Sequence, residues 1–475
     1  MILLRGCPLS IVILLVSAVG CTMVHRDAAA PSSAQAPAPP AASAASAPAK
    51  APTAPATTGP AAAVATTSLA GESSRPALTE DSTADDYVAF AEAANPGLQA
   101  AHFRWQAARE RAPQARSLDD PKLSYTAAIS KDMRIHEVTV EQMFPWFGKL
   151  DLRAAVAEEE ANAARQEYEA QRVRLAYQVK QAFYEYYYLS RSIEAVRGNR
   201  DLVKYLGDVA LAKYRTAGAS QPDVIRAQVE FGKLDDQLRT LEDSRGAAAA
   251  RLNALLARPM DTPTPWPKAV PEEKFDVPDQ EILAWLHESN PELKGLDHEI
   301  VRGKQAIALA EKDYYPDIGI GIGYMNNVER MEGSEDHMVV GMISVTLPIW
   351  REKYAAGVRE AQLRHEAALK MRGDRENMLA ADLKMAAFGL RDATRKIALY
   401  RDTLLPKARE SLQSVEAAFR TGSANFVDLV DARRTLLEFQ LMYERSLVDH
   451  AVRLAEIEML VGRPLPRKGE VLPSK

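Results

Sequence analysis

Three methionines in the second half of the chain could ligate a soft metal ion. Met371, Met378 and Met385 recur every seven residues, and thioether sulfur suits copper(I). Two of them, however, stand next to Leu379 and Ala386, which belong to an apolar repeat described below. The spacing therefore favours packing of these side chains at a helix contact over a metal site.

The other reactive residue types do not form a recognisable site. No pair of histidines has metal-ligand spacing on a helix, and no nucleophile stands near a base in a known pattern. Gly319, Gly321 and Gly323 alternate with isoleucines and no helix follows them, so they do not form a dinucleotide loop. The net charge of −5 argues against nucleic-acid binding. We expect no enzyme activity, no cofactor and no resident metal.

Cys21 is the one residue for which a defined modification is expected. An apolar run from Ile11 to Val19 is too short to span a bilayer and is typical of a secretory signal, which we assign to residues 1–20. The letters Ser-Ala-Val-Gly-Cys that end at Cys21 resemble a bacterial lipobox, in which the cysteine is lipidated after cleavage. The alternative is simple signal cleavage, with Cys21 incidental. Cys7 would leave with the signal, so the exported chain has no disulfide to form.

A tether is expected at residues 21–78. From Ala28 to about Ser74 the chain is almost entirely Ala, Pro, Ser and Thr. Such a segment has too little apolar surface to offset the entropy of ordering, so it predicts a disordered leash after a lipid anchor.

The rest of the chain contains the same unit twice, at residues 79–260 and 280–465. A proline-rich linker at 261–279 joins the copies, and 466–475 is a tail. The matching marks are Asn95-Pro96 with Asn290-Pro291, Phe144-Pro145-Trp146 with Leu347-Pro348-Ile349-Trp350, Tyr214-Arg215-Thr216 with Phe419-Arg420-Thr421, and Asp223 with Asp428.

Each copy predicts a helix on the order of 100 Å long. These helices cover residues 148–216 and 351–420, and apolar residues recur in both at 4-3 spacing, which is typical of a coiled coil. The two seams are Leu175, Val179, Ala182, Tyr186, Leu189, Ile193 and Val196, and Leu379, Leu383, Ala386, Leu390, Ala393, Ile397 and Tyr400. Gly198-Asn199 and Pro406 predict a kink or packing change in corresponding places.

Shorter helices flank the long ones and would pack along them. One helix precedes each strand pair, at about 87–117 and about 279–312, and one follows each long helix, at 221–257 and 426–461. End to end, the flanking helices match the length of the long helices.

Each copy also supplies one β-hairpin, at 122–143 and 317–347. Alternating apolar and polar residues indicate half-buried strands, with glycines on one face of Ile318–Tyr324 and isoleucines on the other. Four strands cannot close a barrel, and an open sheet cannot sit in lipid. Either they form a small soluble sheet or several chains pool their strands. Aromatic residues, among them Phe144, Trp146, Tyr324 and Trp350, are expected at strand ends.

The turns after the long helices carry helix-capping patterns. Ser220-x-x-Asp223 and Asn425-x-x-Asp428 resemble capping boxes, with the carboxylate in the positive first turn. Arg215 and Arg420 could pair with these aspartates within a tip, or with carboxylates of a neighbour.

Taken together, these marks resemble those of TolC-type outer membrane efflux proteins. The resemblance covers about Asp85 to Pro464. It implies a mainly α fold with a small transmembrane β part: antiparallel coiled-coil helices forming a periplasmic α-barrel, and four strands per chain contributing to a trimeric twelve-stranded outer membrane β-barrel. The stretch Met143–Lys149 looks closest to the heavy-metal branch, which serves copper/silver or cobalt/zinc/cadmium pumps.

The resemblance also implies a function, partners and sites. The chain would be the lipid-anchored, homotrimeric exit duct in the outer membrane of a Gram-negative bacterium, working with a periplasmic adaptor and an inner membrane transporter. Its substrates would be heavy-metal ions or drugs. The tips that dock the adaptor and gate the duct would be formed by Arg215, Thr216, Gly218, Ser220, Asp223, Arg420, Thr421, Gly422, Asn425 and Asp428. The membrane junction would be formed by Phe144, Pro145, Trp146, Gly148, Lys149, Pro348 and Trp350. The alternative is a lipid-anchored periplasmic coiled-coil scaffold or adaptor without a pore.

Overall fold

The computed structural model describes residues 78–129, 133–216, 220–270, 272–273, 275, 277–329, 335–421 and 423–466. All of them belong to one structural unit, Leu69–Lys475. The expected signal peptide, the tether, Cys21, Gly218, Gly422 and nearly all of the tail lie outside the described residues.

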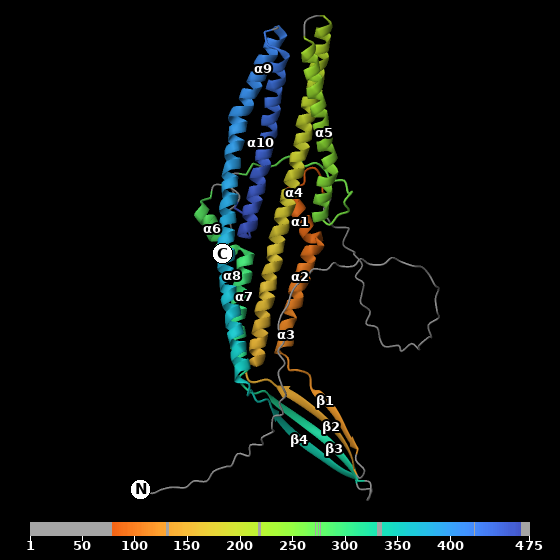
Figure 1. The fold of residues 1–475 in the computed structure, drawn as a ribbon, viewed down its shortest axis with the longest axis vertical. Helices are drawn as coiled ribbons and strands as arrows, with labels where there is room; N and C mark the ends of the chain where they lie inside the picture. Colours follow the sequence, from red (N-terminus) through yellow and green to blue (C-terminus); the bar gives the residue numbers. More distant parts are fainter. Residues whose placement is uncertain are drawn as a thin grey trace, which may run out of the picture. The chain divides into compact units, whose positions relative to one another are not determined.

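Two similar sets of elements follow one another along the chain (Figure 1). The first set is α1 (Ala84–Ala94), α2 (Pro96–Arg109), α3 (Arg111–Arg116), β1 (Lys122–Ile129), β2 (Met133–Phe144), α4 (Lys149–Arg215) and α5 (Gln221–Leu255). The second is α6 (Asp279–Ser289), α7 (Pro291–Lys312), β3 (Ile318–Glu329), β4 (Glu335–Val345), α8 (Arg351–Leu399), a π-helical turn (Tyr400–Leu404), α9 (Leu405–Thr421) and α10 (Phe426–Val461).

The two long helices differ in continuity. α4 runs as α-helix for 67 residues, and Gly198 does not interrupt it. In the second repeat, the π-helical turn separates α8 from α9 just before Pro406. Proline has no N–H to donate to the carbonyl of Asp402, so the regular hydrogen-bond ladder changes register here. None of the described helices combines the length and the apolar composition needed to cross a membrane.

The helix that precedes each strand pair is divided, which corrects the expectation of a single helix. Asn95 ends α1 and caps α2, while Asn290 ends α6 and caps α7. In both places the amide oxygen accepts a hydrogen bond from the backbone three residues on, and proline occupies the first helical position. The Asn-Pro pair therefore stops one helix and starts the next.

Both predicted seams form the core. The seven seam residues of α4 are buried, as are the first six of the second seam, while Tyr400 is half-buried. The first seam packs against α1, α2 and α5, and the second against α6, α7 and α10. The coiled-coil prediction is confirmed for both long helices.

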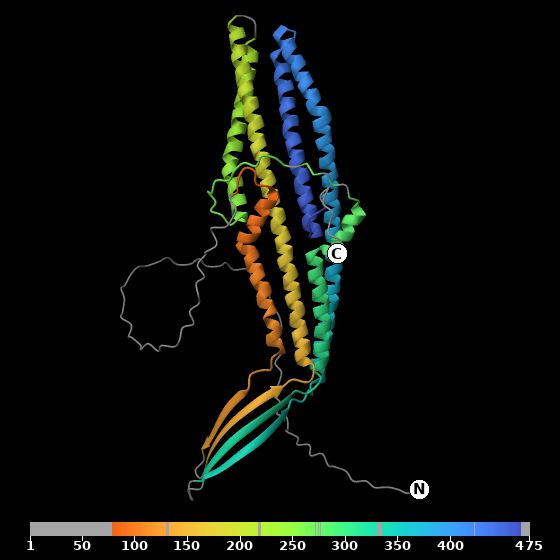
Figure 2. The same cartoon turned by 180° about the vertical axis from the view of Figure 1, so that it is seen from behind.

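The helices form one layer, with α4 in its middle. Nearest the sheet, neighbours in contact follow the order α2, α4, α7, α8; farther away the order is α5, α4, α10, α9 (Figures 1 and 2). Elements of the first repeat therefore lie at one edge of the layer and elements of the second at the other edge.

The strands form one antiparallel sheet in the order β1-β2-β3-β4. The central pair joins the two repeats, with Val138 opposite Tyr324 and Thr139 opposite Gly323. Tyr324 lies within β3 rather than at a strand end, which corrects its expected place, and it also faces Val339 of β4.

Candidate functional site

The turn between α4 and α5 forms the first tip, and the turn between α9 and α10 forms the second tip. Both tips lie at the end of the helical layer that is farthest from the sheet (Figure 1). At the second tip, Oδ1 of Asn425 accepts from the backbone N–H of Asp428 at 2.9 Å, and the Asn425 N–H donates to Oδ2 of Asp428 at 3.2 Å. At the first, Ser220 Oγ donates to Oδ2 of Asp223 at 2.6 Å, and the Ser220 N–H donates to the same oxygen at 3.3 Å. Both aspartates fix the start of a helix, as their spacing predicts.

Two threonines close the helices that lead into the tips. Thr216 Oγ1 donates to the Lys213 carbonyl at 3.0 Å, and Thr421 Oγ1 donates to the Ala418 carbonyl at 3.0 Å. Neighbouring Arg215 and Arg420 are exposed. Within the described part of the chain neither arginine forms an ion pair, so pairing with the aspartate of its own tip is not found.

The structure brings the two tips together through contacts that the sequence did not indicate. Lys213 Nζ lies 4.4 Å from the centroid of the Phe419 ring, at cation–π distance. Below it, Ala210 of α4, Val224 of α5 and Phe426 of α10 share one apolar cluster. At the tips, the first repeat therefore contacts the second through the Lys213–Phe419 cation–π interaction and through this apolar cluster.

An ion pair and a hydrogen bond join the middle of α4 to α10. Lys180 Nζ lies 2.7 Å from Glu458 Oε2, and Tyr187 Oη donates to Glu444 at 3.2 Å. Burial alone would lower the pKa of Lys180, but Glu458 and Asp85 outweigh it and the pKa is raised. Burial, and then the Glu444 charge, raise the pKa of Tyr187 to about 12. These groups therefore keep their charge state across physiological pH.

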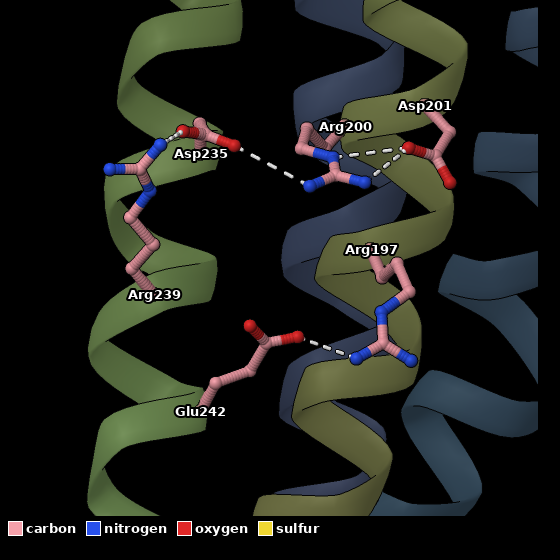
Figure 3. A network of polar contacts seen from close by, with 6 residues as sticks. All are labelled: Arg197, Arg200, Asp201, Asp235, Arg239 and Glu242. Carbon is pink, nitrogen blue, oxygen red and sulfur yellow. Dashed lines mark hydrogen bonds and ion pairs between the residues drawn. The ribbon is translucent and has the colours of Figure 1, made fainter.

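A second polar network joins α4 to α5 within the first repeat (Figure 3). Arg197 pairs with Glu242 at 2.5 Å, and Arg200 bridges Asp201 at 2.7 Å and Asp235 at 3.4 Å. The equivalent stretch of the second repeat has one ion pair, between Arg433 and Glu416, beside an apolar cluster of Leu405, Ala408, Leu412, Leu429 and Leu436. Both repeats therefore combine apolar contacts with ion pairs between these helices, and among the described residues the first repeat has two such pairs where the second has one.

The predicted membrane-junction residues of the first repeat fold around a buried lysine. Gly148 has φ +82°, a left-handed conformation that favours glycine, and turns the chain into α4. Lys149 is only 4 % exposed, and its Nζ lies 2.9 Å from Asp317 Oδ1. The Trp146 N–H donates to the same oxygen at 2.8 Å, and the Trp146 ring stacks on Tyr315. The sequence did not lead us to expect either partner from the second repeat, Asp317 or Tyr315. The position of Asp317, an acidic residue directly after Pro316, was a usable signal.

The remaining junction residues lie apart from this cluster. Phe144, at the end of β2, is 39 % exposed and Pro145 is half-buried. Trp350 caps α8 with its side chain 71 % exposed, and Pro348 is half-buried. The exposed aromatic side chains border the sheet, where aromatic residues were expected.

The sheet has one apolar and one polar face. Leu123, Tyr125, Val138, Val140, Ile320, Ile322, Tyr324, Val339, Ile343 and Val345 share the apolar face, and all are exposed. The other face presents Thr139, Glu141, Ser344 and the three glycines of β3, with Ser344 Oγ donating to Glu141 at 2.5 Å. The predicted alternation of small residues and isoleucines is confirmed.

The methionines do not pack as predicted within this chain. Met371, Met378 and Met385 are 62 %, 52 % and 69 % exposed on α8. Residues seven apart on a helix are separated by about 10 Å, too far to share one ion. Over the residues that the structure covers, no group of three or more His, Cys, Asp or Glu side chains could hold a metal ion.

Comparison with known proteins gives consistent matches over most of the chain. A family model described as outer membrane efflux protein matches residues 89–258 and 284–458. The cobalt-zinc-cadmium resistance protein CzcC of Cupriavidus metallidurans is 22 % identical over 394 residues, which cover 80 % of this chain and 90 % of that protein.

Solved structures share the fold at low sequence identity. A crystal structure of CusC superposes with a TM-score of 0.70 at 14 % identity, covering 81 % of this chain and 92 % of that one. The open-state outer membrane channel MtrE of Neisseria gonorrhoeae superposes with a TM-score of 0.68 at 17 % identity, covering 82 % and 91 %.

Proposed function

Because the chain belongs to the outer membrane efflux protein family, we propose that three copies of it form the exit duct of a tripartite efflux system. The protein is a transport protein and not an enzyme. It receives solutes from an inner membrane transporter through a periplasmic adaptor and releases them outside the cell.

The observation that carries this proposal is the two-faced sheet. Its apolar face is exposed over all four strands, while the opposite face is polar and rich in glycine. Water disfavours such an exposed apolar surface, whereas a lipid bilayer accommodates it. A polar inner face suits the lining of an aqueous channel.

The open edges of the sheet support a closed ring of several copies. Among the described residues, β1 pairs with β2 alone and β4 pairs with β3 alone. A sheet edge in lipid leaves backbone groups without hydrogen bonds, so β4 of one copy must pair with β1 of the next until the barrel closes. Three copies pool twelve strands, an even number within the range of outer membrane barrels.

The tips are the proposed contact with the adaptor. Arg215 and Arg420 are exposed and form no ion pair among the described residues, so they are available to acidic groups of a partner. The Lys213–Phe419 contact holds the two tips of a chain together. Adaptor binding to splayed tips shifts the population toward the open duct, because a ligand favours the state that it binds better.

The proposed cargo is a divalent heavy-metal ion, with drugs as the second class. The support is the relative named for cobalt, zinc and cadmium resistance. Among the described residues no group of three or more His, Cys, Asp or Glu side chains could hold a metal ion, and we assign selection of the ion to the pump and adaptor. Lipidation of Cys21 would hold the N-terminus in the outer membrane, with the helices in the periplasm.

The test of the proposed function starts with the assembled protein. Detergent extraction of outer membranes should yield a heat-modifiable trimer that conducts ions in planar bilayers. Arg420→Ala and Asp428→Ala should then alter metal resistance or conductance and leave the trimer intact. Lys204→Ala, at an exposed position on α4 below the tip, is the matched control. A monodisperse monomer that is soluble without detergent would exclude the duct.

A further inference from the structure

We propose that the cavity between α4, α9 and α10 binds a small organic carboxylate with an apolar body. The cavity has a volume of about 530 Å³, a size that suits a drug-sized molecule. It lies beside Gly198 and Leu405, in the region where the sequence predicts a kink or packing change in both long helices. The proposed function makes no use of this cavity, so the inference stands apart from it.

Gly198 and the π-helical turn leave the space for this cavity. A Cβ added to Gly198 would meet no heavy atom within 4 Å, so the space beside it is open. The π-helical turn, Tyr400–Leu404, ends directly before Leu405, and such turns occur frequently at functional sites. One face of α4, at helical spacing around the glycine, lines the cavity: Arg191, Glu194, Ala195, Gly198, Asn199 and Leu202.

Two arginines supply positive charge at the cavity. Arg409 lies one turn after Leu405 on α9, and its exposed guanidinium forms no ion pair or hydrogen bond with a described residue. Arg433 of α10 pairs with Glu416 through Nη2, while its Nε is buried and has no acceptor in the described chain. A guanidinium presents its N–H groups in a planar fork that matches a carboxylate. The N–H groups left over therefore favour an anion.

Two amide side chains add hydrogen-bonding capacity. Asn199 of α4 and Gln440 of α10 line the cavity and are half-buried. Neither side chain forms a hydrogen bond with any residue that the structure describes. Each amide carries two N–H donors and one acceptor oxygen. Two arginines and two amides, from three helices, thus offer one ligand donors that the described chain does not use.

The acidic residues of the lining limit the charge of the ligand. Glu194 and Glu444 both line the cavity and both pair with Arg191, at 2.5 Å and 3.3 Å. One negative charge on the ligand is enough to pair with Arg409. A second negative charge would lie close to two carboxylates, which would repel it. A monocarboxylate therefore fits this cavity better than a phosphate dianion does.

Leucines from all three helices form the apolar part of the lining. Leu202 of α4 is half-buried, while Leu405 of α9 and Leu436 and Leu437 of α10 are buried. These side chains would remove the apolar part of a ligand from water. Since α4 belongs to the first repeat and the other two helices to the second, a bound ligand contacts both repeats. It therefore stabilises the packing that the structure describes.

Isothermal titration calorimetry of the full-length, detergent-extracted protein tests the site, with 4-phenylbutanoate as the probe. We expect this carboxylate to bind about tenfold or more tightly than its neutral amide, 4-phenylbutanamide, because the amide lacks the charged hydrogen-bond acceptor. Arg409→Gln should weaken binding of the carboxylate by about the same factor and leave binding of the amide unchanged. The matched control is Arg251→Gln, which changes an exposed arginine of α5 outside the cavity. It should bind the carboxylate as the wild type does.

Filling the cavity gives a second, independent test. Gly198→Leu places a side chain in the open space and raises the helix propensity of the position, so this variant should fold. It is expected to abolish binding of the probe. Gly232→Leu on α5 is the control, because a Cβ there also meets no heavy atom within 4 Å.

The outcomes separate this inference from the proposed function. No binding of 4-phenylbutanoate by the wild type, or equal affinity for the carboxylate and the amide, would overturn the inference. Unchanged affinity in Arg409→Gln or in Gly198→Leu would also overturn it. None of these measurements involves conduction or metal resistance, so a negative result would leave the proposed duct intact.

Discussion

Nζ of Lys149 lies 2.9 Å from Oδ1 of Asp317, and this contact joins the β2–α4 junction of the first repeat to the α7–β3 junction of the second. The same oxygen accepts the Trp146 N–H, and Asp313 lies 3.4 Å from the lysine. One buried cation thus fixes the angle at which the chain turns from strand to long helix.

Replacing Lys149 by Met should destabilise this junction. Removal of the ammonium group leaves two carboxylates facing each other, partly relieved by solvent because Asp313 is half exposed. We expect a loss of about 1–3 kcal/mol, measured as a lower dissociation temperature of the trimer in detergent. Lys353→Met, an exposed position on the first turn of α8, should leave the temperature unchanged. Equal temperatures for both variants would contradict a structural role for Lys149.

Asn290 should contribute to the stability of the fold through two hydrogen bonds. It is 2 % exposed; its Oδ1 caps α7 at 3.0 Å, and its Nδ2 donates to the Leu460 carbonyl at 2.7 Å. Asn290→Ala should cost about 2 kcal/mol in thermal unfolding, because both partners lose their bond in a buried site. Asn290→Ser keeps a capping oxygen but not the amide donor, so it should lose less. If the two variants unfold alike, the capping bond contributes little.

Acidification should weaken the packing of the linker around His450. This residue of α10 is 4 % exposed and lines a cavity of about 590 Å³ with Glu272, Arg395 and Arg401. Burial lowers its pKa, and the Glu272 charge offsets only part of this. Below about pH 6.5 the unfolded chain binds a proton at His450, whereas the folded chain does not. The free energy of unfolding therefore keeps its full value above that pH and falls below it. His450→Gln should remove this part of the pH dependence of the melting temperature; an unchanged profile would exclude His450 as its source.

Salt should loosen the first repeat more than the second. α4 and α5 are joined by two ion pairs, the exposed Arg197–Glu242 pair and the partly buried Arg200–Asp235 pair (Figure 3), whereas α9 and α10 share an apolar cluster and one partly buried ion pair, Arg433–Glu416. Raising the salt concentration from about 0.01 M to about 1 M shortens the screening length from roughly 30 Å to roughly 3 Å. Amide hydrogen exchange should accelerate more in α5 than in α9. Equal acceleration in both helices would contradict this assignment.

The Lys213–Phe419 contact should favour the closed duct. A cation–π interaction of about 0.5–1 kcal/mol corresponds to a two- to fivefold change in an equilibrium. Lys213→Gln should therefore increase the open probability in planar bilayers by about that factor. Lys204→Gln, at an exposed position about two and a half turns earlier on α4, serves as the control. A decrease in open probability, or an equal increase in the control, would contradict the prediction.

The sequence by itself determined the repeat, the two heptad seams, the capping boxes and the two-faced strands. Each of these depends on neighbours within about four residues or on a fixed period, so side-chain types at known spacing specify them. Val179 and Leu383 are buried as their spacing predicts. The single helix expected before each hairpin was wrong, because a local rule, the Asn-Pro stop, was overlooked.

Only the tertiary structure decided which distant groups meet. Asp317 and Lys149 are 168 residues apart, and Asn290 and Leu460 are 170 apart. No local periodicity relates such positions, because their contact depends on how two repeats pack side by side. The methionine spacing likewise indicated a packed face on α8, and only the structure revealed that the described helices leave these methionine side chains exposed. Two faces of one helix carry the same heptad signal, and the sequence does not state which partner each face receives.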